Sequence, residues 1–445
     1  MNKPSKARTS TTVASGDVCA GWKVALLDQI AKRGSGHTPN KGYPEYWNGG
    51  IKWISLADSR RLDKGLVTES DKEISLAGVR NSSAVIHPAG TVILSRDAGV
   101  GKSGVLAQAM AVSQHFIAWD CTASTELHNW YLYHWLQQQK PEFERMAVGS
   151  TIKTIGLPYF KKLKIMLPAF EEQLRMASIL STWDQAIATS ERLLENSRSQ
   201  WHALVSKSLH MPTANPDWLK SEDNGGFPAS VQAGIPLLPS APSGWRRVQL
   251  REHLTEVRRP VDLKDEDTYT LVTVKRSRAG VVLRNVLRGS AVKTATQFHV
   301  RSGDFLISKR QIVHGACGIV PPELDGAVVS NEYAVLNTDG EIDLKFLRYL
   351  SETRYFQQTC FHSSIGVHVE KMLFKTDHWC RWPFNIPSLE QQRRIVEILD
   401  TAGRELDALS RQVNTLKREK AALMSQILTG KRRVKRREAE METQT

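Results

Sequence analysis

Two segments of the chain carry apolar residues at alternating spacings of three and four, and they lie 219 positions apart. The helix-pairing residues of the apolar seam in the second segment are Leu399, Leu406, Leu409, Val413, Leu416 and Leu423. In the first segment Leu180, Ile187, Leu194 and Trp201 recur every seven positions, and the facing positions are Trp183, Ser190, Ser197 and Leu204. Such spacing over several heptads is typical of helices that pair in a coiled coil. Each seam continues for about 40 residues, roughly 60 Å of helix. This length favours antiparallel pairing of the two helices, although packing of each helix on its own domain remains an alternative.

The two segments also begin alike, and they stay in register without a gap. The identical pairs at their starts are Pro168 and Pro387, Glu171 and Glu390, and Gln173 and Gln392. A proline before the first full turn and acidic residues within it both favour a helix start. A duplication of this size predicts an architecture of two similar halves.

Each half contains a globular segment before its long helix. The entries are Gly21-Trp22 and Gly244-Trp245, and prolines and glycines are dense between the halves. We therefore expect a flexible tail at 1–20, a first domain at 21–166, a helix at 167–210, a linker at 211–243, a second domain at 244–385, a helix at 386–430 and a basic tail at 431–445.

Short β-branched runs bounded by turn residues predict strands in both globular segments. They occur at 51–56, 90–95, 271–274, 303–308 and 333–336, with helical stretches near 126–145 and 342–358. The runs at 90–95 and 303–308 are offset by 213 positions, against 219 in the helices, so these segments have diverged by insertion and deletion. The fold class we expect is α+β, with two mixed α/β domains separated by two long antiparallel coiled-coil helices in a pseudo-twofold repeat.

Composition narrows the function. The formal net charge of +14 favours a polyanionic partner, nucleic acid above all. The five scattered cysteines fit reduced thiols in the cytoplasm, and no apolar run is long enough to predict a membrane span. The sequence has no metal-ligand spacing, cofactor fingerprint or nucleophile–base motif that predicts chemistry, so we expect no catalysis, metal or cofactor in this chain.

Basic and polar residues recur at loops in both halves, where they could bind phosphates or read base edges. The candidates are Arg60, Arg61, Arg96, Lys102, Ser103, Ser150, Thr151, Lys153, Lys275, Arg276, Lys309, Arg310, His314, Ser363, Ser364 and His368. The run Gly99–Ser103 resembles the end of a phosphate-binding loop, but Arg96 stands where that motif needs its first glycine. A strand-end turn facing a DNA backbone is the better interpretation, and a solvated loop is the plain alternative for any one cluster.

The duplicated helix starts, the Gly-Trp entries, and the runs G-T-V-I-L-S-R and G-D-F-L-I-S-K together resemble the specificity (S) subunit of type I restriction–modification systems. The resemblance covers about 20–210 and 244–430. It implies two target recognition domains that read an asymmetric bipartite site in double-stranded DNA.

The resemblance also implies partners. The long helices would dock two modification subunits, which bind S-adenosylmethionine and methylate adenine, and restriction subunits with translocase and nuclease activity could join. Two alternatives remain: a coiled-coil structural protein with incidental basic charge, and the recognition module of another methyltransferase.

Overall fold

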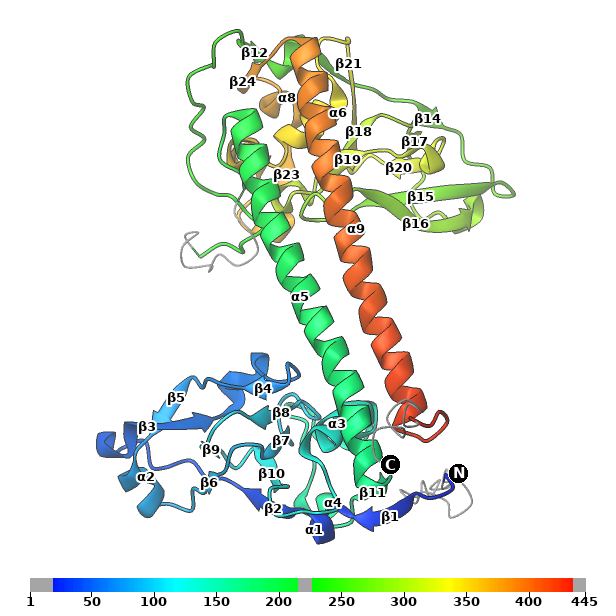
Figure 1. Ribbon diagram of the computed structural model, residues 1–445. Helices are drawn as coiled ribbons and strands as arrows, with labels where there is room; N and C mark the ends of the chain where they lie inside the picture. The colour runs from blue at the N-terminus through cyan, green and yellow to red at the C-terminus, as the bar shows by residue number, and fades with distance from the viewer. Residues whose placement is uncertain (1–18, 215–225, 435–445) are drawn as a thin grey trace, which may run out of the picture. The chain divides into compact units, whose positions relative to one another are not determined.

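The computed structural model describes residues 19–214 and 226–434, and the chain divides into two compact units. Unit 1 contains the chain up to Arg192 and from Arg411 onward, and unit 2 contains Leu193–Ser410. Each long helix therefore contributes one part to each unit (Figure 1).

Unit 1 is a mixed α/β domain followed by the first long helix. Its elements are β1 (Lys23–Leu26), α1 (Leu27–Ile30), β2 (Lys32–Ser35), β3 (Trp47–Ile54), β4 (Leu66–Val67), β5 (Lys72–Ile74), α2 (Leu76–Arg80), β6 (Ile86–His87), β7 (Val92–Ser95), β8 (Ser103–Leu106), β9 (Met110–Val112), β10 (Phe116–Asp120), α3 (Asn129–Met146), α4 (Leu157–Phe160), β11 (Lys164–Leu167) and α5 (Phe170–Leu209). The strands form sheets of order β2-β10-β7-β8-β4, β5-β3-β9-β6 and β1-β11.

Unit 2 repeats this plan with different lengths. Its elements are β12 (Arg246–Gln249), β13 (Leu254–Glu256), β14 (Pro260–Val261), β15 (Thr268–Val274), β16 (Val281–Arg288), β17 (Gln297–His299), β18 (Phe305–Ser308), β19 (Cys317–Ile319), β20 (Val328–Ser330), β21 (Tyr333–Thr338), α6 (Leu344–Leu350), α7 (Arg354–His362), β22 (Ser364–Ile365), β23 (Leu373–Phe374), α8 (Thr376–Trp379), β24 (Pro383–Ile386) and α9 (Leu389–Ile427). The sheets are β13-β21-β18-β19, β14-β17-β20-β15-β16, β12-β24 and β22-β23.

The predicted fold class is confirmed. All five β-branched runs overlap strands, namely β3, β7, β15, β18 and β21, and the helical stretches overlap α3, α6 and α7. The strands interior to the sheets, such as β7 and β18, are buried on both faces, which explains why their sequences are continuously apolar rather than alternating.

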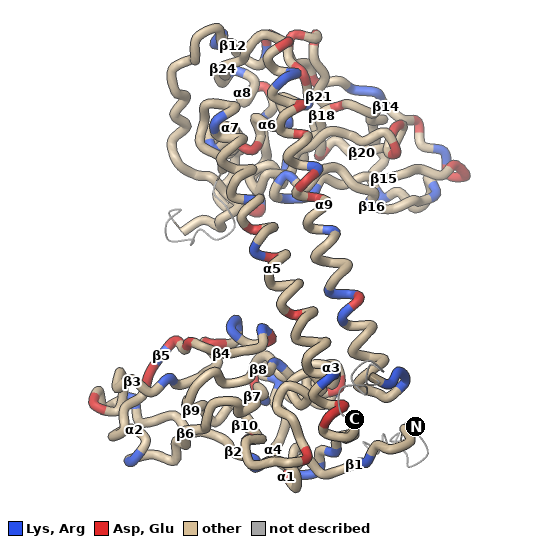
Figure 2. Tube along the Cα trace, viewed as in Figure 1, with Lys and Arg blue, Asp and Glu red and all other residues tan. Residues whose placement is uncertain are grey.

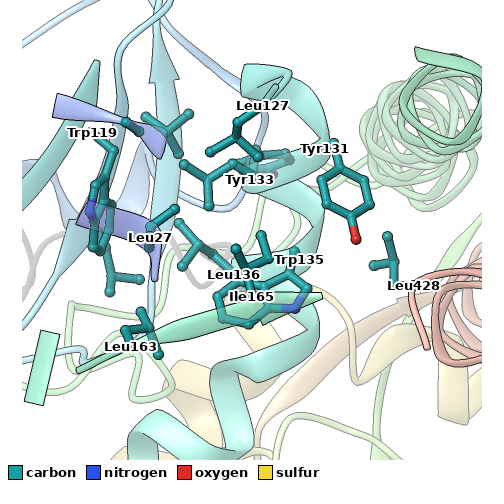
Figure 3. Close-up of a cluster of buried hydrophobic side chains, with 14 of the residues drawn as sticks. Leu27, Trp119, Leu127, Tyr131, Tyr133, Trp135, Leu136, Leu163, Ile165 and Leu428 are labelled. Carbon is teal, nitrogen blue, oxygen red and sulfur yellow. The ribbon is translucent and has the colours of Figure 1, made fainter. Parts of the chain in front are cut away.

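Each core is completed by the beginning of one long helix and the end of the other. In unit 1, Met176 and Leu180 of α5 join Met424 and Ile427 of α9 in the same hydrophobic cluster as the α3 aromatic residues. Figure 3 shows Leu428, just after α9, beside Tyr131 of α3. In unit 2, the corresponding cluster contains Val205 and Leu209 of α5 and Val396 and Leu399 of α9. Packing of the long helices on the domains, the alternative to helix pairing, is therefore present at the helix ends.

Between those ends, the long helices pair antiparallel within each unit. In unit 1, Lys420 bonds to Asp184, and Lys417 Nζ lies 2.7 Å from Glu191 Oε1. In unit 2, the indole of Trp201 lies against Gly403, where an added Cβ would stand 4.0 Å from its Nε1. Of the seam residues, Leu180, Ile187, Leu194, Leu399 and Val413 are buried, and Trp201, Leu406, Leu409, Leu416 and Leu423 are partly buried.

The repeated glutamine at the two helix starts makes the same contacts in both units. Gln173 accepts a hydrogen bond from the His128 backbone N–H (2.9 Å) and donates to the carbonyls of Glu126 (2.7 Å) and Pro168 (3.0 Å). The second glutamine repeats this set.

Gln392 accepts from the Asp343 N–H (2.8 Å) and donates to the carbonyls of Glu341 (2.9 Å) and Pro387 (3.0 Å). Both glutamines are fully buried. Each fixes its long helix to the segment that leads into a domain helix, α3 in unit 1 and α6 in unit 2, which explains the identity at this position.

The described part of the predicted linker packs on unit 2. Val231 and Gln232 are buried, and the ring of Phe227 lies 5.4 Å from that of Phe361. At the start of the predicted basic tail, Arg433 forms an ion pair with Glu172 (2.9 Å). The remainder of both terminal tails, 1–18 and 435–445, and the linker segment 215–225 lie outside the described residues.

Candidate nucleic-acid interface

Three loops of unit 1 come together at one end of its central sheet, and we call 55–65, 96–102 and 147–156 the first loop cluster. Lys102 Nζ, in the turn between β7 and β8, donates to the carbonyl (3.1 Å) and hydroxyl (2.9 Å) of Ser59. The N–H of Ile155 donates to the carbonyl of Arg96 (3.0 Å). These bonds join loops that lie far apart in the sequence.

Unit 2 builds an equivalent arrangement from the loops 275–280, 309–316 and 363–375, the second loop cluster. The N–H of Ser277 donates to the carbonyl of His314 (2.8 Å), and the N–H of Phe374 donates to the carbonyl of Lys309 (2.9 Å). The second bond corresponds to the bond between Ile155 and Arg96 in unit 1. The predicted recurrence of loops at equivalent places is therefore present in the backbone hydrogen bonds of both units.

The turn 275–280 is held by a buried ion network. Ser277 and Arg278 both adopt left-handed backbone conformations, with φ of 55° and 59°, which are strained for residues other than glycine. Arg278 Nε lies 2.6 Å from Glu352 Oε2, and Arg348 Nη1 lies 2.6 Å from Glu352 Oε1. Burial alone would raise the pKa of Glu352, but the two guanidinium groups outweigh burial and lower it. The carboxylate is therefore ionised at neutral pH and fixes this turn.

Acidic partners neutralise many cations in the clusters. Arg61 pairs with Asp58 (3.0 Å), Arg276 with Glu370 (2.7 Å), and Arg310 with Glu332 (2.6 Å). Figure 2 shows Lys and Arg interspersed with Asp and Glu in both units. The excess positive charge is therefore distributed, and a polyanion would have to exchange with some of these acidic partners.

Over residues 19–214 and 226–434, no group of three or more His, Cys, Asp or Glu side chains could hold a metal ion. Among the helices of that same part of the chain, none combines the length and apolar character needed to cross a membrane.

Residues 20–196 match the family model described as the type I restriction modification DNA specificity domain. The MjaVIII specificity subunit of Methanocaldococcus jannaschii is 21% identical over 430 residues, which cover 93% of each chain. The chain is therefore similar to the specificity (S) subunits of type I restriction–modification enzymes. The MjaIX specificity subunit of the same organism is 26% identical over 199 residues, which cover 44% of each chain.

The fold of this chain has a solved counterpart. The S subunit of a type I restriction–modification system from M. genitalium superposes with a TM-score of 0.53 at 14% identity, covering 92% of this chain and 96% of the other. At this identity the likeness concerns the fold alone.

The candidate residues of the chain differ widely in exposure. The exposed ones are Arg60, Arg61, Ser150, Thr151 and Lys153 in the first cluster, and Lys275, Arg276, Arg310 and His368 in the second. Arg96, Lys102 and Lys309 are partly buried, and Lys309 Nζ lies 3.1 Å from Glu256 Oε1.

Four candidates require correction because their side chains are buried inside the protein. The hydroxyl of Ser103 accepts from Gln137 Nε2 (2.7 Å), that of Ser363 accepts from Trp382 Nε1 (3.0 Å), and that of Ser364 donates to a backbone carbonyl. His314 is 1% exposed, and burial, with a smaller effect of the Arg276 charge, lowers its pKa. These side chains support the loops and do not face a ligand.

The sequence pattern did not indicate a further exposed surface, which lies on the edge strand β16. Its Leu283 and Val286 are 54% and 51% exposed, and Arg284 and Asn285 lie between them. Arg284 and Asn285 line a cavity of about 250 Å³ together with Gln297. The run Val281–Arg288 does not alternate regularly, so its pattern gave no indication that both faces of the strand are exposed.

Proposed function

We propose that this S subunit reads duplex DNA at two different half-sites, one with each loop cluster, and supplies no catalytic group of its own. The observation that carries this proposal is the equivalent construction of the two clusters from unlike sequences. Equivalent placement supports a common task, and unlike exposed residues, such as Ser150 and Lys153 in one cluster and Lys275 and His368 in the other, support different targets. The resulting site is asymmetric and bipartite.

The proposal extends to partners through the family. The long helices offer docking surfaces to two modification subunits, which bind S-adenosylmethionine and methylate adenine in the cytoplasm. Restriction subunits join the same complex. No cofactor belongs to the S subunit itself in this scheme.

Between the half-sites, the paired helices act as the spacer. α5 has 40 residues and α9 has 39, and their starts are fixed by the equivalent glutamines Gln173 and Gln392. Inserting one heptad into each helix keeps the seam in phase. It should lengthen the unspecified spacer and leave both half-sites unchanged, whereas altered half-sites would contradict this division of tasks.

The direct test is methylation mapping in cells that express the chain with its cognate modification subunit. We expect one asymmetric interrupted motif that disappears when the gene for this chain is deleted. A short continuous palindrome, or an unchanged methylome after deletion, would refute the proposal.

A binding assay separates DNA reading from the alternative of a coiled-coil structural protein. Binding of the assembled complex to target duplex should weaken steeply with salt, because phosphate contacts release counterions. The variants Lys153→Ala and Lys275→Ala should lower the slope of log affinity against log salt by about 1 each. Arg80→Ala, an exposed cation of α2 outside both clusters, is the matched control and should leave the slope unchanged. Salt-independent binding, or equal effects of all three variants, would favour the structural alternative.

A further inference from the structure

The hairpin loop of each cluster exposes two large apolar side chains. In unit 1, Val148 and Ile152 are 73% and 56% exposed. In unit 2, Ile365 and Val367 are 57% and 96% exposed, and Val367 is the most exposed large apolar residue in the part of the chain that the structure describes. Single exposed apolar residues are common on protein surfaces, but here a pair recurs at the equivalent place in both units.

These apolar residues are held next to the basic loops. In unit 1, Val148 and Thr154 exchange backbone hydrogen bonds (3.0 and 2.9 Å), and Thr154 also bridges to Asp97 in the turn that carries Lys102. The N–H of Ala98 donates to the carbonyl of Lys153 (3.3 Å).

In unit 2, the hairpin is anchored through Glu370, whose Oε2 lies 2.7 Å from Arg276 Nη2 and whose Oε1 lies 3.2 Å from His314 Nε2. In this hairpin, Ser364 of β22 pairs with Phe374 of β23, and the loop between the two strands carries Val367. In both units, therefore, an apolar loop stands beside cations that suit a phosphate backbone.

We propose that these hairpin loops read thymine through its 5-methyl group in the major groove. The inference rests on the proposed DNA-reading function and names the chemical group that the loops recognise. The major-groove edge of an A·T pair presents this methyl group, which an apolar side chain contacts favourably and a hydrogen-bonding side chain does not. The neighbouring cations bind the phosphate backbone of the DNA and position the loop in the groove. The contact of the valine or isoleucine side chain with the methyl group then makes binding depend on the base.

The sequences of the two loops fit surfaces that recognise different DNA bases. The loop sequences, V-G-S-T-I-K in unit 1 and I-G-V-H-V-E in unit 2, share the apolar character and differ in their polar members. Shared apolar residues fit a methyl group common to both half-sites, and the differing polar residues fit different neighbouring bases.

The test uses the assembled complex and the target identified by methylation mapping. Deoxyuridine replaces thymidine in one half-site at a time, which removes only the methyl group. We expect unmodified protein to bind about fourfold more weakly for each contacted methyl that is lost, from the transfer free energy of one buried methyl group.

The variants Val148→Ser and Val367→Ser remove both γ-methyl groups and leave a small polar side chain. Each should weaken binding to thymine-containing target and abolish the further loss on deoxyuridine in one half-site, a different half-site for each variant. Ile235→Ser is the matched control, because Ile235 is 76% exposed and lies outside both clusters. It should bind like the unmodified protein on both duplexes.

Several outcomes overturn the inference while the proposed function stands. They are salt-dependent, target-specific binding that is insensitive to deoxyuridine, variants that keep the full deoxyuridine effect, half-sites without an A·T pair, and variants that lose the modification subunit instead. Loss of specific, salt-dependent binding by the unmodified complex would instead refute the proposed function itself.

Discussion

Replacing Gln392 by leucine removes one of the two glutamines that fix the long helices. The side chain is fully buried and makes three hydrogen bonds, one to a backbone N–H and two to carbonyls. Leucine has a similar volume, so the change creates little cavity and mainly leaves three backbone groups without partners. At about 1 kcal/mol net for each bond, and more where a buried group stays unsatisfied, the loss is about 3–5 kcal/mol.

The cost should be local to unit 2, because all four residues of this contact lie within it. Amide hydrogen exchange of the full chain measures the local stability of each unit directly. It does not require the two-state unfolding that a chain of two units need not show. We expect faster exchange of the amides at Asp343 and in α6, with the amides at α3 unchanged. Gln173→Leu should give the mirror result, with faster exchange at His128 and in α3.

The neighbouring Gln391 provides the control. Its side chain is exposed, so Gln391→Leu should change stability by less than about 0.5 kcal/mol. If Gln391→Leu and Gln392→Leu had equal effects, the identity of the repeated glutamine would have to be explained by something other than these hydrogen bonds.

Three further predictions concern charge. Glu352→Gln leaves two partly buried guanidinium groups without their buried counter-charge and should lower the amide-exchange opening free energy of unit 2 by about 3–5 kcal/mol, whereas Glu370→Gln, at a half-exposed pair, should cost less than about 1 kcal/mol; equal costs would contradict a stabilising role of the buried carboxylate. Burial, with a smaller effect of a nearby lysine, lowers the pKa of His134 from 6.5 to about 3, so the unfolded chain binds a proton below pH 6.5 that the folded chain does not. Stability should therefore fall by about 2 kcal/mol from pH 7 to pH 5, and an unchanged pH slope in His134→Phe would refute this assignment. Arg433→Ala should speed amide exchange at both ends of the described chain in unit 1, and Arg432→Ala, an exposed neighbour, should not.

The sequence predicts the parts of this fold that follow a period. The seams around Leu180 and Leu399 repeat every three or four positions, and helices of 40 and 39 residues follow from them. The five β-branched runs overlap strands for a different reason, because β-branched residues between turn residues favour strands without any alternation. The identity of Gln173 and Gln392 marks an important position, but its partners come from segments about 45 to 50 residues earlier in the chain, and no local pattern identifies them.

The loop candidates show where such reasoning ends. A serine in a polar stretch of sequence can lie on the surface and contact DNA, or lie in the interior and hydrogen-bond to another residue. Which of the two occurs depends on residues far away in the sequence. Ser103 meets Gln137 and Ser363 meets Trp382, and both are buried by residues that only the tertiary structure brings near. The sequence around the exposed residues Lys153 and Lys275 is similarly polar. The sequence alone therefore does not distinguish these exposed candidates from the buried serines.

The two short sheets at the domain entrances have a consequence for how new specificities arise. Lys23 pairs with Leu167 in β1–β11, and Arg246 pairs with Ile386 in β12–β24, so the first and last strands of each domain lie side by side just before its long helix begins. The two ends of each domain are therefore held together by a short sheet. The length of the polypeptide between them does not affect the position at which the long helix begins. Recombination between genes at these strands could replace one half-site of the target in a single step while the spacer and the other half-site are inherited intact.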